Sequence, residues 1–414
     1  MKRTVVIGAG VIGLATAYGL AKRGRKVVVI DQGKPGDACT KGNAGWVTPA
    51  ISAPIPAPGL TWTSLKWMAR SDSPLYIAPT AVPSMSRWLW RFWRHCNAAD
   101  FERGLHAVAE LNRPTMALFD QLEREGVQFE LHRQGLLFTF VDENYMKETL
   151  AEFGHYGQYG YRLPTPLSGG EVRALEPVLS DEVRCGFQVE EEYHVRPETL
   201  AAGYVTKLVE FGVTLRSGVA VRGMIRDNGR VVAVQTDAGD EPADDVVVAA
   251  GAWTGLVVEH LGVSLPVQAG KGYSITLNGE GPRLTRPIYL GEARVGCSPF
   301  DGAVRFAGTM ELSGINTLLD RRRIVGIRKG IARYLRTPVP PEAGIEWVGM
   351  RPLTPDGLPL LGRVPGFSNA YVASGHAMLG VTLAPVTGEA MADLVTGVPS
   401  RPVLGPFDPG RFNW

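Results

Sequence analysis

The sequence predicts an α/β protein that begins with a nucleotide-binding strand–turn–helix–strand unit and carries a second, β-rich region in its later half. Two observations predict this class. An apolar strand, Val5–Ile7, runs into the glycine pattern Gly8–Gly13, and a second apolar strand ends at Asp31. Farther along, strand-like segments begin at Leu265 and continue past Glu311. With 414 residues, 45% of them hydrophobic and 20% charged, the chain has enough apolar material for two or three domains.

The opening unit has the spacing of a dinucleotide-binding turn. Gly8, Gly10 and Gly13 fall where the chain turns tightly, where a pyrophosphate approaches the backbone and where the helix packs on the strand. The helix that follows through Leu20 supplies free N–H groups to an anion. Asp31 lies about 20 residues farther on, where a carboxylate accepts hydrogen bonds from ribose hydroxyls. Such glycine turns are common on their own, but the strand, helix and acid together favour nucleotide binding.

Composition excludes several classes of protein. The net charge of +2 gives no reason to expect a nucleic-acid partner. The four cysteines have no CxxC spacing, so we expect neither a disulfide framework nor a metal site. Lys2-Arg3 and the apolar residues after it imitate a secretory signal, but cleavage would remove the glycine turn, so we expect a mature N-terminus and a cytoplasmic protein. The longest apolar run, Val246–Val258, is interrupted and too short to cross a bilayer.

An aromatic and basic segment, Trp88–Arg94, combines three tryptophans with arginines on a predicted short helix. Such residues suit a membrane surface or a partner protein. No long basic amphipathic helix surrounds the segment, so a helix packed on its own domain is the favoured interpretation. A peripheral contact with the inner face of a membrane remains the alternative.

Four further segments have clear patterns. Asp100–Glu125 is expected to form one long surface helix, and Pro197–Phe211 another helix. Asp244–Trp253 has the pattern of a buried parallel strand whose small terminal residues leave room for a ligand. Arg321–Leu335 is expected to be helical, with its charges on a solvated face.

Two segments near the end of the chain carry a family resemblance. Trp347–Pro359 and Gly375–Pro385 closely resemble FAD-dependent amino acid dehydrogenases and oxidases of the D-amino acid oxidase superfamily, and among these the bacterial D-amino acid dehydrogenase type. Gly42–Gly45, Val246–Trp253 and Gly270–Tyr273 occur in the family's order. The resemblance therefore spans almost the whole chain.

This resemblance implies a Rossmann-like, glutathione-reductase-like FAD-binding domain with an inserted β-sheet-rich substrate domain. The FAD-binding domain is expected in residues 1–55, 170–262 and 340–414, and the substrate domain in residues 56–169 and 263–339. Sarcosine oxidase relatives attach the flavin to a cysteine shortly before the TPD motif, but this chain has no cysteine after Cys297. FAD is therefore expected to be bound non-covalently.

The resemblance also implies which residues hold FAD. They are Gly8, Gly10, Val11, Ile12, Gly13, Asp31 and Gln32 at the ADP half, Asn43, Ala44 and Gly45 near the flavin ring or its chain, Val221 near the adenine, Ala250, Gly251 and Trp253 at the end of the buried strand, and Gly375, His376, Leu379, Gly380, Val381 and Thr382 around the isoalloxazine.

Electrostatics gives the last of these segments a physical role. Reduced flavin is anionic around N1 and the C2 carbonyl, so N–H groups from a turn and from a helix that begins near Thr382 would stabilise it. Pro385 suits the first turn of such a helix. Gly375, Gly380 and Gly388 would disfavour a helix that only packs on the sheet.

Arg351 is the leading candidate for the substrate site. In related amino acid oxidases an arginine in a similar stretch binds the substrate carboxylate, and a guanidinium can pair bidentately with it. His376 and Tyr273 are further candidates for the catalytic site, and His194 is a possible pocket residue, although a structural role is the favoured interpretation for both Tyr273 and His194. Some relatives place an arginine just after the glycine-histidine pair, where this chain has Ala377 and Met378.

The expected reaction is oxidative deamination of a D-amino acid by hydride transfer from Cα to flavin N5, which gives a 2-oxo acid and ammonia. Oxidation of D-proline, D-hydroxyproline or another N-substituted amino acid, and a glycine-oxidase-like activity, use the same chemistry and stay open. From other classes, an NAD-dependent dehydrogenase or a flavoprotein devoted to partner binding would share the opening turn. The sequence does not distinguish oxygen from a quinone or another electron acceptor, and it leaves the oligomeric state open.

Overall fold

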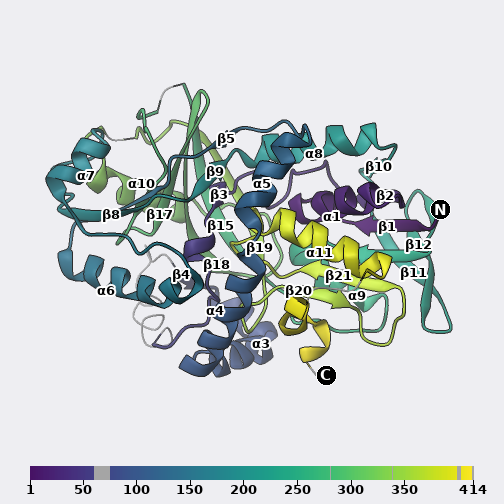
Figure 1. Cartoon of the computed structure of the whole chain (residues 1–414). Coiled ribbons are helices and arrows are strands. Elements are labelled where there is room, and N and C mark those ends of the chain that lie inside the picture. Colours follow the sequence, from purple (N-terminus) through teal and green to yellow (C-terminus); the bar gives the residue numbers. More distant parts are fainter. Residues whose placement is uncertain (60–74, 280, 338, 399–401, 413–414) are drawn as a thin grey trace.

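The computed structural model of the chain describes residues 1–59, 75–279, 281–337, 339–398 and 402–412. Two β-sheets lie side by side in Figure 1. One half of the molecule contains a six-stranded sheet, and the other half contains a nine-stranded sheet. This arrangement confirms the predicted α/β fold with a second, β-rich part.

The six-stranded sheet contains the opening unit. Its strands lie in the order β10 (Thr214–Ser217), β2 (Lys26–Asp31), β1 (Arg3–Ile7), β14 (Asp245–Val248), β21 (Ala370–Ser374) and β20 (Leu360–Arg363). All pairs are parallel except β20 with β21. The chain leaves β1 toward β2 on one side and reaches β14 on the other, so β1 lies where the strand order reverses. Ligands of such sheets bind at the carboxyl ends of the strands at this point.

Both faces of this sheet are covered, which explains its apolar strands. Val6, Val27 and Val247 pack on one face, and Val5 and Ile7 on the other. The elements on the first face are α1 (Val11–Lys22), α8 (Pro197–Glu210) and α11 (Ala384–Thr396), and those on the second are β11 (Val221–Asp227), β12 (Arg230–Thr236), β13 (Gly239–Pro242) and α9 (Thr254–Glu259).

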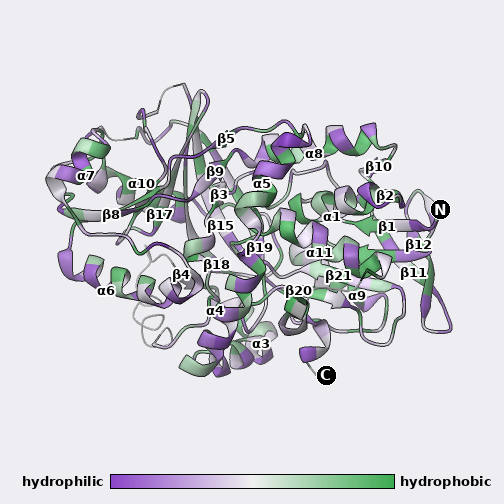
Figure 2. Cartoon of the chain, viewed as in Figure 1, coloured by the Kyte–Doolittle hydropathy of each residue, from purple (hydrophilic) through white to green (hydrophobic). Residues whose placement is uncertain are grey.

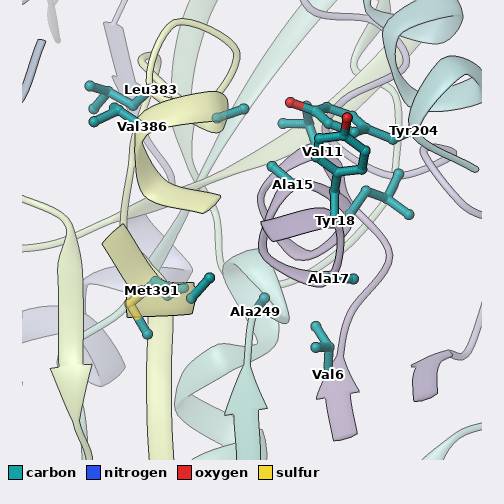
Figure 3. Packing of buried hydrophobic residues seen from close by; sticks show 14 of the residues in the cluster. Val6, Val11, Ala15, Ala17, Tyr18, Tyr204, Ala249, Leu383, Val386 and Met391 are labelled. Carbon is teal, nitrogen blue, oxygen red and sulfur yellow. The ribbon is translucent and has the colours of Figure 1, made fainter. Parts of the chain in front are cut away.

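The helices α1 and α11 pack unusually closely, and Figure 3 shows their buried side chains beside Val6 and Ala249 of the sheet. A Cβ at Gly388 would lie 2.4 Å from the carbonyl oxygen of Ala15, and one at Gly19 would lie 2.7 Å from that of Gly388. Gly388 therefore serves packing. This corrects the expectation that it would disfavour a packed helix, because its missing side chain allows the two backbones to touch.

The long helix expected over Asp100–Glu125 is two helices, α4 (Ala98–Asn112) and α5 (Thr115–Arg124). Pro114 lies between them and interrupts the helix because it has no N–H group to donate to the preceding turn. The helices are also not confined to the surface. Val108 and Phe119 are fully buried in the core that contains α1.

The nine-stranded sheet assembles distant parts of the chain. Its strands lie in the order β19 (Ile345–Leu353), β15 (Gln268–Asn278), β18 (Ala303–Leu312), β17 (Val295–Phe300), β16 (Ile288–Leu290), β6 (Leu136–Phe140), β8 (Cys185–Val189) and β7 (Leu167–Ser168), with β4 (Leu75–Ile77) paired to β18. The nearby helices are α6 (Glu143–Phe153), α7 (Gly169–Leu175) and α10 (Arg321–Tyr334).

Helix α10 covers one face of the nine-stranded sheet. Ile324 and Ile327 pack there against Tyr273 and Phe306. The expectation that its charges are all solvated is wrong for Arg323, which is 3% exposed and lies over the Tyr76 ring. A charge run on a helix does not reveal which of its arginines points inward.

The two sheets divide the chain differently from the expected domain boundaries. β19 falls within residues 340–414 but belongs to the nine-stranded sheet, as does β8, which lies within residues 170–262. The helices α4 and α5, from residues 56–169, pack with the six-stranded sheet instead. Strand pairing between distant segments decides membership, and local patterns do not report it.

Besides the two large sheets and the three-stranded sheet β11–β12–β13, the described residues form one more small sheet, called the third sheet below, and one more α-helix. The sheet has the order β3 (Trp46–Val47), β9 (Tyr193–Val195) and β5 (Leu131–His132). The helix α3 (Val82–Arg94) carries both hydrophilic and hydrophobic residues (Figure 2). Its Trp88 is buried and donates through Nε1 to the carbonyl oxygen of Pro266 at 3.0 Å, so this part of the aromatic segment packs on its own protein.

Candidate active site

The glycine turn after β1 is set by close backbone contacts. Gly8 has a φ of +109°, and a Cβ there would lie 2.3 Å from the carbonyl oxygen of Ala249. A Cβ at Gly13 would lie 1.9 Å from the carbonyl oxygen of Gly8. Gly10 precedes α1 in an extended conformation. The strand end and the helix start therefore meet more closely than any side chain would permit.

The backbone donors at this turn fall into two groups. The N–H of Ala9 donates to Asp31 Oδ2 at 2.6 Å, and that of Val11 donates to Thr40 Oγ1 at 3.1 Å. The N–H groups of Ile12 and Gly13 find no acceptor within the described ranges. Unpaired donors at a helix start suit an anionic ligand such as a pyrophosphate.

Asp31 and its neighbours form the edge of this turn. The Asp31 carboxylate also accepts from the N–H of Gly33 at 2.7 Å, so it orders the turn and keeps further acceptor positions. Gln32 is exposed. The N–H of Val219 donates to the Asp31 carbonyl oxygen at 2.9 Å, which brings Val221 at the start of β11 to the same edge.

The end of β14 connects the two sheets. Ala250 and the short helix η4 (Gly251–Trp253) follow this strand, and Ser374 Oγ donates to the Gly251 carbonyl oxygen at 3.0 Å. Trp253 packs with Met350 of β19 and Ala269 of β15. These residues lie where the six-stranded sheet meets the nine-stranded one.

The loop Gly42–Trp46 leads from the turn to the third sheet. Asn43 Oδ1 accepts from the N–H of Gly45 at 2.7 Å. Gly45 has a φ of +77°, and a Cβ there would lie 1.9 Å from the carbonyl oxygen of Val195. The N–H of Ala44 has no acceptor in the part of the chain that the structure describes.

The turn between β21 and α11 offers a second group of donors. The N–H groups of Gly380, Val381 and Thr382 have no acceptor among the described residues. Helix α11 begins at Ala384, two residues later than expected, with Pro385 in its first turn. The three donors therefore belong to the turn before the helix.

Side-chain contacts hold this turn against the loop. Thr382 Oγ1 donates to the Trp46 carbonyl oxygen at 3.0 Å and accepts from the N–H of Thr48 at 3.3 Å. Gly375 has a φ of +78° and Leu379 is half-buried in the core beside α11. The two segments expected to enclose the flavin ring are thus in direct contact.

His376 is a buried, neutral histidine. Its Nε2 lies 3.0 Å from Thr387 Oγ1, and its Nδ1 is a buried atom without a hydrogen-bond partner among the described residues. Burial lowers the pKa of His376 to about 3. It therefore does not exchange a proton near neutral pH.

Arg351 lies on a face of the nine-stranded sheet where two paired residues, Gly272 and Gly349, carry no side chain. A Cβ at Gly272 would lie 2.3 Å from Arg351 Cζ, so the guanidinium lies flat on that glycine. Gly349, the cross-strand partner of Gly272, is covered in the same way by the Trp347 ring, which also touches Gly42. We call this surface, formed by Gly272, Trp347, Gly349 and Arg351, the Arg351 face. It looks toward the loop that starts at Gly42.

Among the described residues, no carboxylate neutralises the charge of Arg351. Nη1 donates to the Thr309 carbonyl oxygen at 2.9 Å, and no ion pair to Arg351 exists among the described residues. The side chain is half-buried, and burial lowers the pKa of the guanidinium from its usual value, although it stays protonated. Burying an unpaired cation is unfavourable, so this arrangement suits an anionic ligand.

Tyr273 does not lie with Arg351. Adjacent residues of a strand point to opposite faces, and Gly272 lies under Arg351. Tyr273 is 1% exposed among the residues that pack on α10, and its hydroxyl donates to Glu311 Oε2 at 2.7 Å. The expected catalytic position of Tyr273 is corrected by this alternation.

His194 is also structural. Its ring stacks on His132 with centroids 4.6 Å apart, and Nε2 donates to the Pro299 carbonyl oxygen at 2.8 Å. Burial lowers the pKa of His194 to about 4. Nearby, Glu130 and Asp301 bring ligand atoms close to His132, but Glu130 already accepts from His132 and from the N–H of Asp301, and we assign no metal to this cluster.

Sequence reasoning missed three side chains that bind this region. Thr40 caps the Val11 N–H, Ser298 Oγ donates to the Ala44 carbonyl oxygen at 2.7 Å, and Arg305 Nη1 donates to the Asn43 carbonyl oxygen at 2.8 Å. Arg305 had a signal in the sequence. It alternates with Val304 and Phe306 in a strand, which places a charge on an otherwise small-residue face.

The two groups of free donors fit the expected cofactor. One group lies at the start of α1, where a pyrophosphate would bind, and the other lies in the Gly380–Thr382 turn, where an electron-rich ring would bind. Across the described residues, no helix is both long and apolar enough to cross a membrane.

Comparison with known proteins agrees with this geometry. The chain matches the family described as FAD dependent oxidoreductase (DAO) over residues 3–394. It is 31% identical to a D-amino acid dehydrogenase of Chromohalobacter salexigens over 98% of both chains. A glycine oxidase from Geobacillus kaustophilus superposes with a TM-score of 0.77 at 22% identity, covering 99% of this chain and 98% of the other. An iminodiacetate oxidase from Chelativorans sp. BNC1 superposes with a TM-score of 0.73 at 25% identity, covering 98% and 99%. The protein therefore belongs to the DAO family of FAD-dependent oxidoreductases.

Proposed function

We propose that this protein is an FAD-dependent dehydrogenase of D-amino acids, which it oxidises to imino acids that water converts to 2-oxo acids and ammonia. The observation that carries the proposal is the Arg351 guanidinium, which is half-buried over Gly272 and has no carboxylate partner among the residues that the structure describes. A substrate carboxylate would supply the missing anion. The names of the curated relatives at about 31% identity support a D-amino acid as substrate.

The cofactor-binding residues in this proposal are those expected from the sequence. Gly8, Gly10, Val11, Ile12 and Gly13 would hold the pyrophosphate. Asp31, Gln32 and Val221 would hold the ribose and adenine. The flavin would be held by Asn43, Ala44, Gly45, Ala250, Gly251, Trp253, Gly375, His376, Leu379, Gly380, Val381 and Thr382. Cys39 interacts electrostatically with Arg351, and burial raises the pKa of its thiol above the usual value although the guanidinium opposes this. A raised pKa disfavours the thiolate, which supports non-covalent binding.

FAD, when bound, supplies a hydride acceptor. The residues of the chain supply orientation and electrostatics. Arg351 binds the carboxylate and thereby fixes Cα, while the free N–H groups of Gly380, Val381 and Thr382 stabilise negative charge beside them. In this proposal His376 lines the site as an uncharged side chain and transfers no proton. A substrate whose amine is already neutral needs no general base.

N-substituted amino acids are the second candidate substrates. The 25% identity to an iminodiacetate oxidase favours this group, to which D-proline and D-hydroxyproline also belong, and a glycine-oxidase-like activity stays a further candidate. All of them carry the carboxylate that Arg351 would bind, so the geometry of this residue does not separate them.

A quinone is the proposed electron acceptor, with α3 as a peripheral membrane contact. Trp90 and Trp93 are 53% and 57% exposed, and Arg94 lies 5.0 Å from the centre of the Trp90 ring. Exposed tryptophans next to arginines suit an anionic lipid surface. Sedimentation with anionic vesicles tests this, and a W90A/W93A double variant that sediments like the wild type would contradict it.

The proposed reaction is tested by anaerobic mixing of the purified holoenzyme with a panel of D- and L-amino acids, glycine and N-substituted amino acids. We expect D-amino acids to bleach the flavin absorbance. No bleaching by any member of the panel would contradict the proposal. Reoxidation by a soluble quinone and by oxygen, compared in the same cuvette, identifies the acceptor.

A further inference from the structure

Two buried side chains of the nine-stranded sheet hold the backbone of the loop Gly42–Trp46. Arg305 on β18 is 3% exposed, and its Nη1 donates to the Asn43 carbonyl oxygen at 2.8 Å. Ser298 on β17 is fully buried, and its Oγ donates to the Ala44 carbonyl oxygen at 2.7 Å. Two consecutive carbonyls of one loop are therefore drawn toward the same sheet.

These contacts fix the direction of the peptide groups. In a trans peptide the C=O and N–H bonds point in opposite directions, and the described chain contains no cis peptide. Because the Asn43 carbonyl points at Arg305, the N–H of Ala44 points away from it, and this N–H has no acceptor in the described part of the chain. The next N–H, of Gly45, is used by Asn43 Oδ1. Ala44 thus presents a single oriented donor.

Arg305 itself is held rigidly. Its Nε donates to Thr276 Oγ1 at 3.0 Å on β15, its Nη2 pairs with Glu198 in the first turn of α8, and its guanidinium lies 5.2 Å from the centre of the Phe300 ring. Glu198 belongs to a helix of the six-stranded half. Arg305 therefore ties the loop to both halves of the molecule, and a lysine cannot reproduce this because its ammonium lacks the planar fork.

Ser298 connects the loop Gly42–Trp46 to the Gly380–Thr382 turn, the second segment expected to face the flavin. Its Oγ accepts from Trp46 Nε1 at 2.9 Å, and the Trp46 carbonyl oxygen accepts from Thr382 Oγ1 at 3.0 Å. The oriented donor of Ala44 and the free donors of the Gly380–Thr382 turn are thus connected through Ser298 and Trp46. The sheet that carries Arg351 also sets the geometry of the loop beside it.

We propose that Arg305 and Ser298 are positioning residues that fix the Ala44 N–H as a hydrogen-bond donor to the flavin ring. The inference rests on the proposed function only in taking the loop Gly42–Trp46 as the flavin-facing one. Neither residue contacts the substrate in this scheme.

The experiment compares Arg305→Lys and Ser298→Ala with Arg222→Lys, a control at an arginine whose side chain is 67% exposed. We measure the FAD dissociation constant by flavin fluorescence, the visible spectrum and reduction potential of the bound flavin, and the thermal midpoint of the apoprotein. Loss of one charge-assisted hydrogen bond predicts about tenfold weaker FAD binding for Arg305→Lys and a changed flavin spectrum. The control should match the wild type.

A purely structural role would lower the apoprotein midpoint and leave the dissociation constant, spectrum and potential unchanged, which would overturn the inference. Ser298→Ala keeps the inference falsifiable if Arg305→Lys does not fold. A failure of the proposed reaction gives a different result. If the wild type binds FAD and the two variants change its binding and spectrum, but no amino acid reduces the flavin, the D-amino acid proposal is contradicted. The positioning roles of Arg305 and Ser298 then still hold.

Discussion

The two halves of the site are built by opposite means. At the carboxyl end of β1, recognition depends on missing side chains, because Gly8 and Gly13 allow backbone groups to meet and leave the N–H of Ile12 free. On the Arg351 face, one long charged side chain lies over a bare glycine. In the first half, the glycine spacing and Asp31 lie within 31 consecutive residues, whereas the Gly8 contact with Ala249 reaches beyond them. The second half brings together two strands, β15 and β19, from separate parts of the chain. Backbone sites can thus be encoded locally, and side-chain sites need the tertiary fold.

Gly13→Ala is expected to have the largest effect, because it disrupts the backbone turn at the carboxyl end of β1. Its Cβ would lie 1.9 Å from a backbone carbonyl oxygen, which cannot move aside as a flexible side chain could. We expect the variant to be purified without FAD, as measured by the absorbance of the isolated protein. Gly154→Ala is the matched control, because a Cβ there meets nothing within 4 Å, and it should retain the cofactor. An unaltered FAD content in Gly13→Ala would refute the role of this contact.

The second half is broken by Arg351→Met. Two charge-assisted hydrogen bonds contribute about 1.5–3 kcal/mol each, so we expect KM for the amino acid to rise roughly a hundredfold or more. FAD affinity should be unchanged. Because the variant removes a half-buried cation that has no carboxylate partner in the described ranges, the thermal midpoint of the apoprotein should stay the same or rise. Unaltered saturation kinetics would remove Arg351 from the substrate site.

Tyr273→Phe tests whether the face of the nine-stranded sheet opposite Arg351 has only a structural role. The variant loses the 2.7 Å hydrogen bond to buried Glu311, which should lower the free energy of unfolding by about 1–2 kcal/mol in denaturant titrations. We expect kcat/KM to stay within about twofold, since the residue lies on the face opposite Arg351. A large fall in kcat with unchanged stability would place Tyr273 in the catalytic site after all.

The last prediction is a pH dependence of stability that appears only below neutral pH. The pKa of His376 is about 3 in the folded protein, well below its ordinary value, so the unfolded chain binds the proton more tightly. The free energy of unfolding should therefore fall as pH decreases from about 6.5 toward 3. His376→Gln should show a shallower slope in denaturant titrations at several pH values. An identical slope would show that His376 is not buried in its neutral form.

Particular residues explain how far prediction from sequence extends. The β1–α1–β2 unit, Asp31 and the carboxylate-binding candidate Arg351 could be placed because local spacing or a motif marks them. Pro114 was visible in the sequence, but the helical spacing on both sides of it obscured the break. The face on which Tyr273 lies follows from strand alternation only once Gly272 is known to lie under Arg351.

The local sequence does not show which backbone groups Arg305 and Ser298 contact. Arg305 meets the Asn43 carbonyl across 262 positions of sequence, and Ser298 meets that of Ala44 across 254. Such pairs depend on how the two sheets are brought together. Spacing rules describe neighbours along one helix or strand, so they do not report contacts of this kind.

The most direct test of the account asks whether the carboxylate selects the substrate. A D-amino acid and the amine that lacks its carboxyl group are mixed anaerobically, each in turn, with the wild-type holoenzyme and with Arg351→Met, while the flavin absorbance is followed. We expect the D-amino acid to bleach the wild-type flavin rapidly and the amine to bleach it little. We expect both compounds to bleach the variant slowly and at nearly equal rates. Equal bleaching of the wild type by the two compounds, or none by either, would contradict the account.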